Sequence, residues 1–142
     1  EGGRSIHTEP LVWVGSEDHS GHLRTPLPLV LAPPPCIYRT RMLNGLNQMG
    51  RSCRIVYLSS SYNGISAAVQ AGIGVTVMAG STIPPGTKIL SEREGLPALG
   101  QLELRLHRGM ASKSEALFRL EDYIAGSFAR SAPQRGQMRT GD

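Results

Sequence analysis

Aromatic residues and long hydrophobic runs are scarce in this chain. Its 142 residues include two Phe, four Tyr and one Trp. Nucleic-acid surfaces interleave basic residues with aromatics, so this composition argues against direct binding of nucleic acid. The apolar runs are too short and too interrupted to span a bilayer, and the first residues contain no apolar signal core. We therefore expect no contact with a membrane.

Cysteine is also scarce, because the chain has only two. The predicted strands place Cys36 after the end of one strand and Cys53 at the start of the next parallel one. The two thiols would then lie at opposite edges of a sheet, too far apart to form a disulfide. A reducing, cytoplasmic environment is therefore expected. The chain begins with Glu1 instead of Met, which suggests a piece of a longer protein.

Acidic residues are absent between Asp18 and Glu92. The same interval contains these basic residues: Arg24, Arg39, Arg41, Arg51, Arg54 and Lys88. This excess of positive charge favours an anionic ligand, and uncompensated surface arginine explains it equally well. The interval also offers no carboxylate for acid/base chemistry such as that of glycosidases or proteases. No catalytic residue is predicted, and the chain is not expected to be an enzyme.

Motifs for metals and phosphates are weak or missing. His19 and His22 stand in a loop without a helix or further ligands in register, so a solvated loop is favoured over a metal site. Gly72-Ile-Gly74 lacks the third glycine of a dinucleotide fingerprint and leads from a helix into a strand. The phosphate-loop pattern with Lys and Ser or Thr is absent. The sequence therefore predicts no metal and no cofactor.

Residues 53–78 have the pattern of a β-α-β unit. A β-branched apolar run ends in Ser59, Ser60 and Ser61, an alanine-rich segment closes at Gly72, and a Val-rich run follows. We expect two parallel strands joined by a right-handed crossover helix. The serines then fall where open α/β sheets present free N–H groups to a ligand, and Ser60 or Ser61 is also a candidate for the N-cap of the helix.

The other elements follow from periodicity and turn residues. We expect further strands at residues 11–15, 29–32, 87–90 and 101–107, and helices at 37–49 and after a capping box at Ser112 and Glu115. Three prolines, residues 33–35, predict a stiff connection before the first helix. Residues 1–10 are expected to form a flexible leader, and residues 130–142 a disordered tail.

The ordered set of segments resembles the carboxyl-terminal part of a LysR-type transcriptional regulator. These segments are Leu-Val-Trp-Val-Gly-Ser, Pro-Leu-Pro-Leu-Val-Leu, Arg-Ile-Val-Tyr-Leu-Ser-Ser, Ala-Ala-Val-Gln-Ala-Gly-Ile-Gly-Val-Thr-Val-Met and Leu-Glu-Leu-Arg-Leu-His-Arg. The resemblance spans roughly residues 9–129, and its most specific piece is Ala-Gly-Ile-Gly-Val at the end of the alanine-rich helix.

The resemblance implies an α/β fold of the periplasmic-binding-protein type 2. It implies a lobe with a mostly parallel sheet and flanking helices, together with hinge strands and the final helix of an incomplete first lobe. By similarity, residues 11–16 would be the outgoing hinge strand, 17–99 the second, effector-binding lobe, and 101–129 the returning strand and final helix. The rest of the first lobe is missing, so residues 11–14, the returning strand and the final helix should lack their apolar cover, which predicts self-association.

The family's second lobe faces its ligand with the loop before its first helix and with the strand end before its second helix. Carried over to this sequence, these positions are Cys36, Tyr38, Arg39, Ser59, Ser60 and Ser61. The alternatives are that Tyr38 and Cys36 are ordinary core or rim residues and that Arg39 is solvated.

The resemblance implies a cytoplasmic fragment that senses a small, anionic effector in the cleft between two lobes. The intact regulator would be a homodimer or tetramer and would bind DNA only through a winged helix-turn-helix that this chain does not contain. Two alternatives stay open. One is a lobe of a solute-binding protein in a transport system, and the other, favoured by nothing in the sequence, is a lobe of an enzyme.

Overall fold

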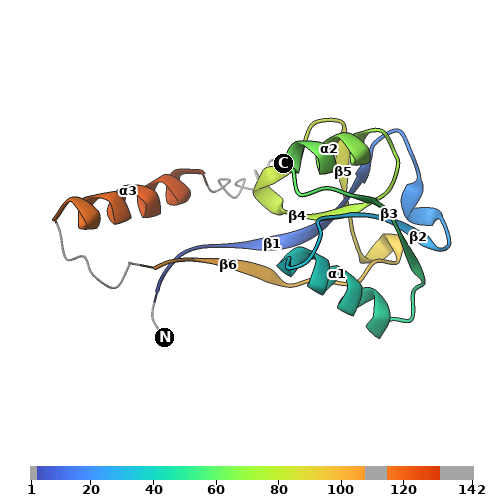
Figure 1. Cartoon of the computed structure of the whole chain (residues 1–142), viewed down its shortest axis with the longest axis horizontal. Coiled ribbons are helices and arrows are strands. Elements are labelled where there is room, and N and C mark those ends of the chain that lie inside the picture. Colours follow the sequence, from blue (N-terminus) through green and yellow to red (C-terminus); the bar gives the residue numbers. More distant parts are fainter. Residues whose placement is uncertain (1–2, 108–114, 132–142) are drawn as a thin grey trace, which may run out of the picture. The chain divides into compact units, whose positions relative to one another are not determined.

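The computed structural model describes residues 3–107 and 115–131. The chain divides into two compact units, one of them Pro10–Leu102 and the other residues 1–9 with 103–142. Figure 1 shows the first unit as a twisted sheet with helices against it. In the described part of the chain, no helix is both long and apolar enough to cross a membrane.

The sheet of the first unit is built around β1, Arg4–Ser16. Strands β4 (Thr76–Ala79) and β5 (Thr87–Leu90) pair with it antiparallel, in the order β4-β1-β5. Strands β2 (Leu27–Leu31) and β3 (Cys53–Leu58) pair with each other in parallel.

Val75, just before β4, joins the two sheets. It bridges in parallel to Leu29 of β2, the Val30 amide donates to the Val75 carbonyl at 2.9 Å, and the Val75 amide donates to the Pro28 carbonyl at 2.9 Å. The order along the sheet is therefore β3-β2-β4-β1-β5, with β1 running opposite to the others, and the predicted mostly parallel α/β lobe is confirmed.

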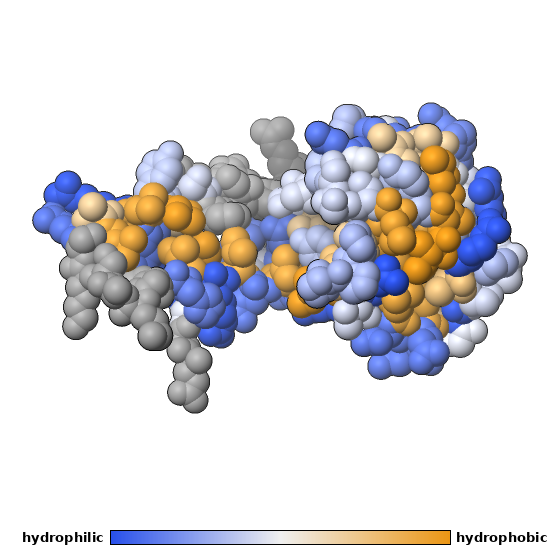
Figure 2. Space-filling view, viewed as in Figure 1, coloured by the Kyte–Doolittle hydropathy of each residue, from blue (hydrophilic) through white to orange (hydrophobic). Residues whose placement is uncertain are grey.

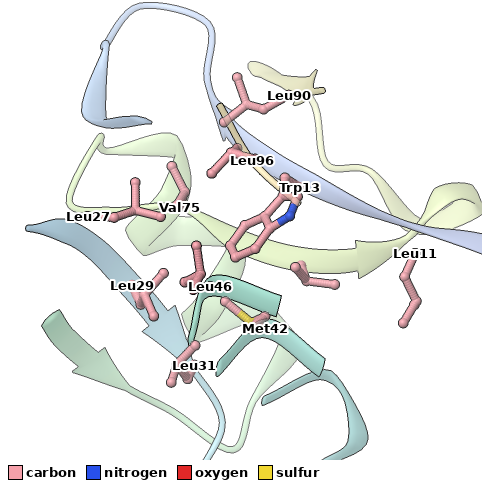
Figure 3. Close-up of a cluster of buried hydrophobic side chains, with 11 residues drawn as sticks. Leu11, Trp13, Leu27, Leu29, Leu31, Met42, Leu46, Val75, Leu90 and Leu96 are labelled. Carbon is pink, nitrogen blue, oxygen red and sulfur yellow. The ribbon is translucent and has the colours of Figure 1, made fainter. Parts of the chain in front are cut away.

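Two helices cover opposite faces of this sheet, α1 (Ile37–Gln48) and α2 (Tyr62–Gln70). Successive side chains of a strand point to opposite faces of the sheet, so β2 contributes side chains to the packing of both helices. Leu29 packs in the cluster that contains Met42 of α1, whereas Val30 packs in the cluster that contains Val69 of α2. Figure 3 shows the first cluster, with the Trp13 ring at its centre.

The Ala-Gly-Ile-Gly segment after α2 requires glycine at two positions. Gly72 has φ +77°, a left-handed conformation that ends the helix as predicted. Gly74 lies where a Cβ atom would be 2.8 Å from the carbonyl oxygen of Pro28, so only glycine lets this backbone approach β2. The segment is therefore a structural joint between α2 and β4.

The predicted leader at residues 1–10 is wrong for the residues that the structure describes, because β1 begins at Arg4. Residues 4–10 are polar apart from Ile6 and Pro10, and β6 (Gln101–Leu106) pairs with β1. Tertiary pairing can satisfy the backbone groups of an extended segment whatever its side chains, so composition did not reveal this strand.

The expectation that residues 11–14 lack their apolar cover is also wrong. Leu11, Trp13 and Val14 are 5%, 2% and 0% exposed. Trp13 packs in the α1 cluster and Val14 in the α2 cluster, so the helices of the unit itself cover both faces of β1.

The second unit contains α3, Glu115–Ser131. The Arg4 guanidinium lies 3.1 Å from the Asp122 carboxylate and 3.8 Å from that of Glu121. Along α3, large apolar side chains remain exposed at Phe118, Leu120 and Tyr123, as expected for a helix without its usual cover. Ser112 of the predicted capping box and residues 132–142 of the predicted tail lie outside the described residues.

Candidate functional site

The candidate site lies at the edge of the sheet where β2 and β3 end. The two strands are parallel, and the Ser59 amide donates to the Leu31 carbonyl at 3.0 Å, which holds their carboxyl ends together. The chain continues from β2 through prolines to Cys36, the N-cap of α1, and from β3 to Ser61, the N-cap of α2. The segments that carry the six predicted residues therefore follow two adjacent strand ends.

The three serines at the start of α2 differ in their hydrogen bonds and in their exposure. The Ser61 hydroxyl accepts a hydrogen bond from the Gly64 amide at 3.3 Å, so the predicted cap is confirmed at Ser61. The Ser59 hydroxyl accepts from the Ser61 amide at 3.1 Å and thereby shapes the turn. Ser59 is half-buried, whereas Ser60 and Ser61 are exposed. No packed protein therefore covers Ser60 and Ser61.

The residues at the start of α1 are held more firmly. Cys36 is half-buried, and its carbonyl accepts from both the amide and the hydroxyl of Thr40, each at 3.1 Å. Tyr38 is half-buried against the α1 cluster. The Arg39 guanidinium donates to the carbonyl of Ala32, at the end of β2, at 3.2 Å. Arg39 is thus anchored at the edge of the sheet.

The electrostatics of this edge favour negative charge. Neither α1 nor α2 has an acidic residue in its first turn, so the partial positive charge of each helix start is not compensated there. Arg39 adds a full positive charge near the start of α1. Backbone amides at the start of α2, serine hydroxyls and a guanidinium together can hydrogen-bond an anion, but they supply no nucleophile with a general base.

The histidine loop, with His19 and His22, contributes to no cluster of metal-ligating side chains in the part of the chain that the structure describes. Among the described residues, no group of three or more His, Cys, Asp or Glu side chains is placed to hold a metal ion. His22 is buried, and its carbonyl accepts a hydrogen bond from the Arg51 guanidinium. Burial, with the nearby positive charges of Lys88 and Arg51, lowers the pKa of His22, and Glu94 opposes this shift only partly.

A cavity of about 510 Å³ lies elsewhere in the first unit, and sequence reasoning missed it. Its walls come from Leu11–Trp13 of β1, the end of β5, and the segment that follows β5. None of the six predicted site residues lines it. In the sequence its walls fall in two predicted strands, residues 11–15 and 87–90, and in the residues that follow the second of them, and none of these patterns carried a ligand signal.

The sheet order and the helix starts gathered at one edge define a lobe of the periplasmic-binding-protein type 2 fold. The chain belongs to the LysR substrate binding domain family, whose model matches residues 2–110. The resemblance seen in the sequence is therefore confirmed.

Curated relatives are transcriptional regulators. The HTH-type transcriptional regulator PecT of Dickeya dadantii (strain 3937) is 33% identical over 94 residues, which make up 66% of this chain and 30% of PecT. The HTH-type transcriptional regulator DgdR of Burkholderia cepacia is 32% identical over 101 residues, 71% of this chain and 34% of DgdR. The chain thus spans about a third of the length of these relatives.

Solved structures share the fold at low identity. Full-length HypT of Salmonella typhimurium, a hypochlorite-specific LysR-type regulator, matches with a TM-score of 0.70 and 14% identity over 91% of this chain and 47% of HypT. The effector binding domain of QuiR in complex with shikimate matches with a TM-score of 0.59 and 14% identity over 91% of this chain and 66% of that domain.

Proposed function

We propose that this chain is the effector-sensing part of a LysR-type transcriptional regulator and binds a small anion where β2 and β3 end. The observation that carries the proposal is the convergence of two acid-free helix starts with exposed Ser60 and Ser61 at one sheet edge. The anion would accept hydrogen bonds from free amides of α2 and from the serine hydroxyls. A cap uses a lone pair of Ser61 and leaves its hydroxyl hydrogen free to donate.

Proteins of the same fold support an anionic ligand. The regulatory domain of HypT has been solved bound to bromide ion, and the effector binding domain of QuiR in complex with shikimate. Both ligands are anions. For this chain, the uncompensated helix starts and Arg39 are the features that favour the same class of ligand.

Sensing would work by a population shift. Residues 11–16 and 101–106 would serve as hinge strands between the second lobe, residues 17–99, and a first lobe that this chain holds only in part. An effector that binds one arrangement of the lobes more tightly shifts the equilibrium towards it. In the intact regulator this shift would change how the DNA-binding heads are arranged. DNA itself would be contacted by a helix-turn-helix segment and not by this lobe.

Self-association into a homodimer or tetramer belongs to the same proposal. Strand β3 pairs only with β2 among the described strands, and it exposes Ile55, Tyr57 and Leu58 by 40%, 41% and 52%. Figure 2 shows hydrophobic surface gathered in the region of β3. An exposed apolar edge strand is a surface that another subunit can cover.

A regulatory role is favoured over the alternatives because PecT and DgdR, two curated relatives, are named transcriptional regulators. A regulator that acts on DNA in a bacterium works in the cytoplasm and needs no catalytic residue in this lobe. A solute-binding protein of transport would use the same fold, and a helix-turn-helix encoded upstream of Glu1 would exclude that role.

The test uses a protein with both lobes restored and the double substitution Ser60→Ala with Ser61→Ala. Calorimetric titration with shikimate, phosphate and bromide first identifies an anion that binds. Its affinity should then fall at least about tenfold, or about 1.4 kcal/mol. Loss of the cap should cost the fold only about 1 kcal/mol.

Ser52→Ala is the matched control, because Ser52 is also exposed but precedes β3 at the opposite edge of the sheet. This variant should bind like the parent protein. If the double variant binds its anion unchanged, the serines are not part of the effector site.

A further inference from the structure

The cavity of the first unit arises where β1 loses its neighbour along one edge. On this edge Trp13 pairs with Leu90 at the end of β5, and the Leu11 amide donates to the Gly100 carbonyl at 3.0 Å. The chain therefore lies along the same edge of β1 on both sides of residues 91–99. Between them, residues 91–100 leave the sheet as a strap, and the cavity opens between this strap and β1.

The strap is held by hydrogen bonds to its main chain. The Trp13 indole N–H donates to the Pro97 carbonyl at 3.0 Å, which fixes both the ring and the strap. Two arginines donate to further main-chain oxygens: Arg41 to Leu99 at 3.1 Å and Gln101 at 2.7 Å, and Arg51 to Glu94 at 3.3 Å and Gly95 at 2.8 Å. The cavity walls are therefore preformed, and a ligand would not have to order them.

The walls of the cavity are largely apolar. Ile89, Pro97, Ala98 and Leu99 contribute accessible apolar surface to them. Leu11, Trp13 and Leu90 also line the cavity but are almost fully buried. Figure 3 shows the Trp13 ring in the same cluster as Leu11 and Leu90. The volume of about 510 Å³ lies within the range of small-molecule sites, roughly 300 to 1,000 Å³.

The polar groups at the rim do not select a charged ligand. Glu92 and Arg93, adjacent in the strap, bring opposite charges to the lining. The Ser91 hydroxyl is already engaged, because it donates to the Glu94 carboxylate at 2.8 Å and accepts from the Arg93 amide at 3.2 Å. A charged group that entered the apolar walls would lose hydration without gaining a net opposite charge.

We propose that this cavity is a second ligand site, separate from the β2 and β3 edge, for a compact, uncharged, alicyclic or aromatic molecule. The hydrocarbon part of the ligand packs against Ile89 and Ala98, which are exposed, close to the buried Trp13 ring, and no ionic contact is required. The regulator would then respond to two ligands of different chemistry, an anion at one site and an apolar molecule at the other.

Three molecules with the same ring test the class of ligand: cyclohexanol, cyclohexanecarboxylate and cyclohexylamine. The 142-residue chain contains one Trp, so its ¹H–¹⁵N spectrum has a single indole N–H signal, that of Trp13. Cyclohexanol should shift this signal in a saturable manner. The carboxylate and the amine should bind at least about tenfold more weakly, because each must give up the hydration of its charge.

Ala98→Phe should abolish the saturable shift by filling the cavity. Ala98 lines the cavity but is exposed, so the larger side chain should not disturb the core. Ala67→Phe is the matched control, on an exposed position of α2 that does not line the cavity. Ile89→Gln serves as a second variant, because Ile89 lines the cavity and is 54% exposed.

The proposal is overturned if cyclohexanol gives no saturable shift, or if Ala98→Phe and Ile89→Gln bind it as well as Ala67→Phe. Equal binding of the carboxylate would overturn the uncharged class of ligand. Ser60→Ala with Ser61→Ala should leave cyclohexanol binding unchanged. The proposal for the cavity and the proposal for the anion site can therefore be refuted independently of each other.

Discussion

Replacing Trp13 with Phe should destabilise the first unit by about 2 kcal/mol. The Trp13 side chain is 2% exposed, and its indole N–H donates to the Pro97 carbonyl, 84 residues away in sequence, at 3.0 Å. Phe removes this hydrogen bond, worth about 1 kcal/mol net. It also removes roughly 40 Å² of buried apolar surface, worth about 1 kcal/mol at 25 cal/mol per Å².

Urea unfolding followed by far-ultraviolet circular dichroism measures this change, because the variant has no Trp left for fluorescence. Leu23→Ala is the control: Leu23 is 69% exposed, so its truncation should change stability by less than about 0.5 kcal/mol. A loss below about 0.5 kcal/mol for Trp13→Phe, or an equal loss for Leu23→Ala, would refute the role of Trp13 as the anchor of the strap.

Three further predictions concern the loops. Arg51→Gln should cost about 2 kcal/mol in urea unfolding, since Arg51 donates to carbonyl oxygens of His22, Glu94 and Gly95, whereas exposed Arg54→Gln should cost almost nothing. The pKa of His22 is lowered in the folded protein, so below pH 6.5 the unfolded chain binds more protons than the folded one. The free energy of unfolding should therefore fall as pH decreases through that region, and His22→Gln should make this fall smaller in a series of urea titrations. Ser61→Ala should lower the thermal midpoint through a loss of about 1 kcal/mol, and Ser60→Ala should not, because only Ser61 accepts the capping bond; equal effects would contradict that assignment.

Local patterns predicted the elements that depend on nearby residues. The helix expected at residues 37–49 is observed at Ile37–Gln48, and the strand expected at 87–90 is observed at Thr87–Leu90. The helix stop at Gly72 was also predicted, and the cap was expected at Ser60 or Ser61 and is observed at Ser61. In each case the deciding interaction lies within a few residues, so sequence spacing carries the information.

The arginines of the acid-free interval show where such reasoning stops. An excess of positive charge suggested either an anionic ligand or free surface arginine. In the structure Arg39, Arg41 and Arg51 each donate to main-chain carbonyl oxygens. Every residue carries a carbonyl, so a partner of this kind leaves no mark in the sequence.

The sequence by itself determined the α/β alternation, the family, and the position of the serines between a strand and a helix. Only the tertiary structure decided that residues 4–10 join β1, that helices cover both faces of that strand, and that the strap, residues 91–100, borders an open cavity beside Trp13. Strand pairing and the bond from Trp13 to Pro97 connect segments far apart in the chain. Such contacts depend on the packing of the whole unit, whereas a cap or a helix stop depends on a single turn.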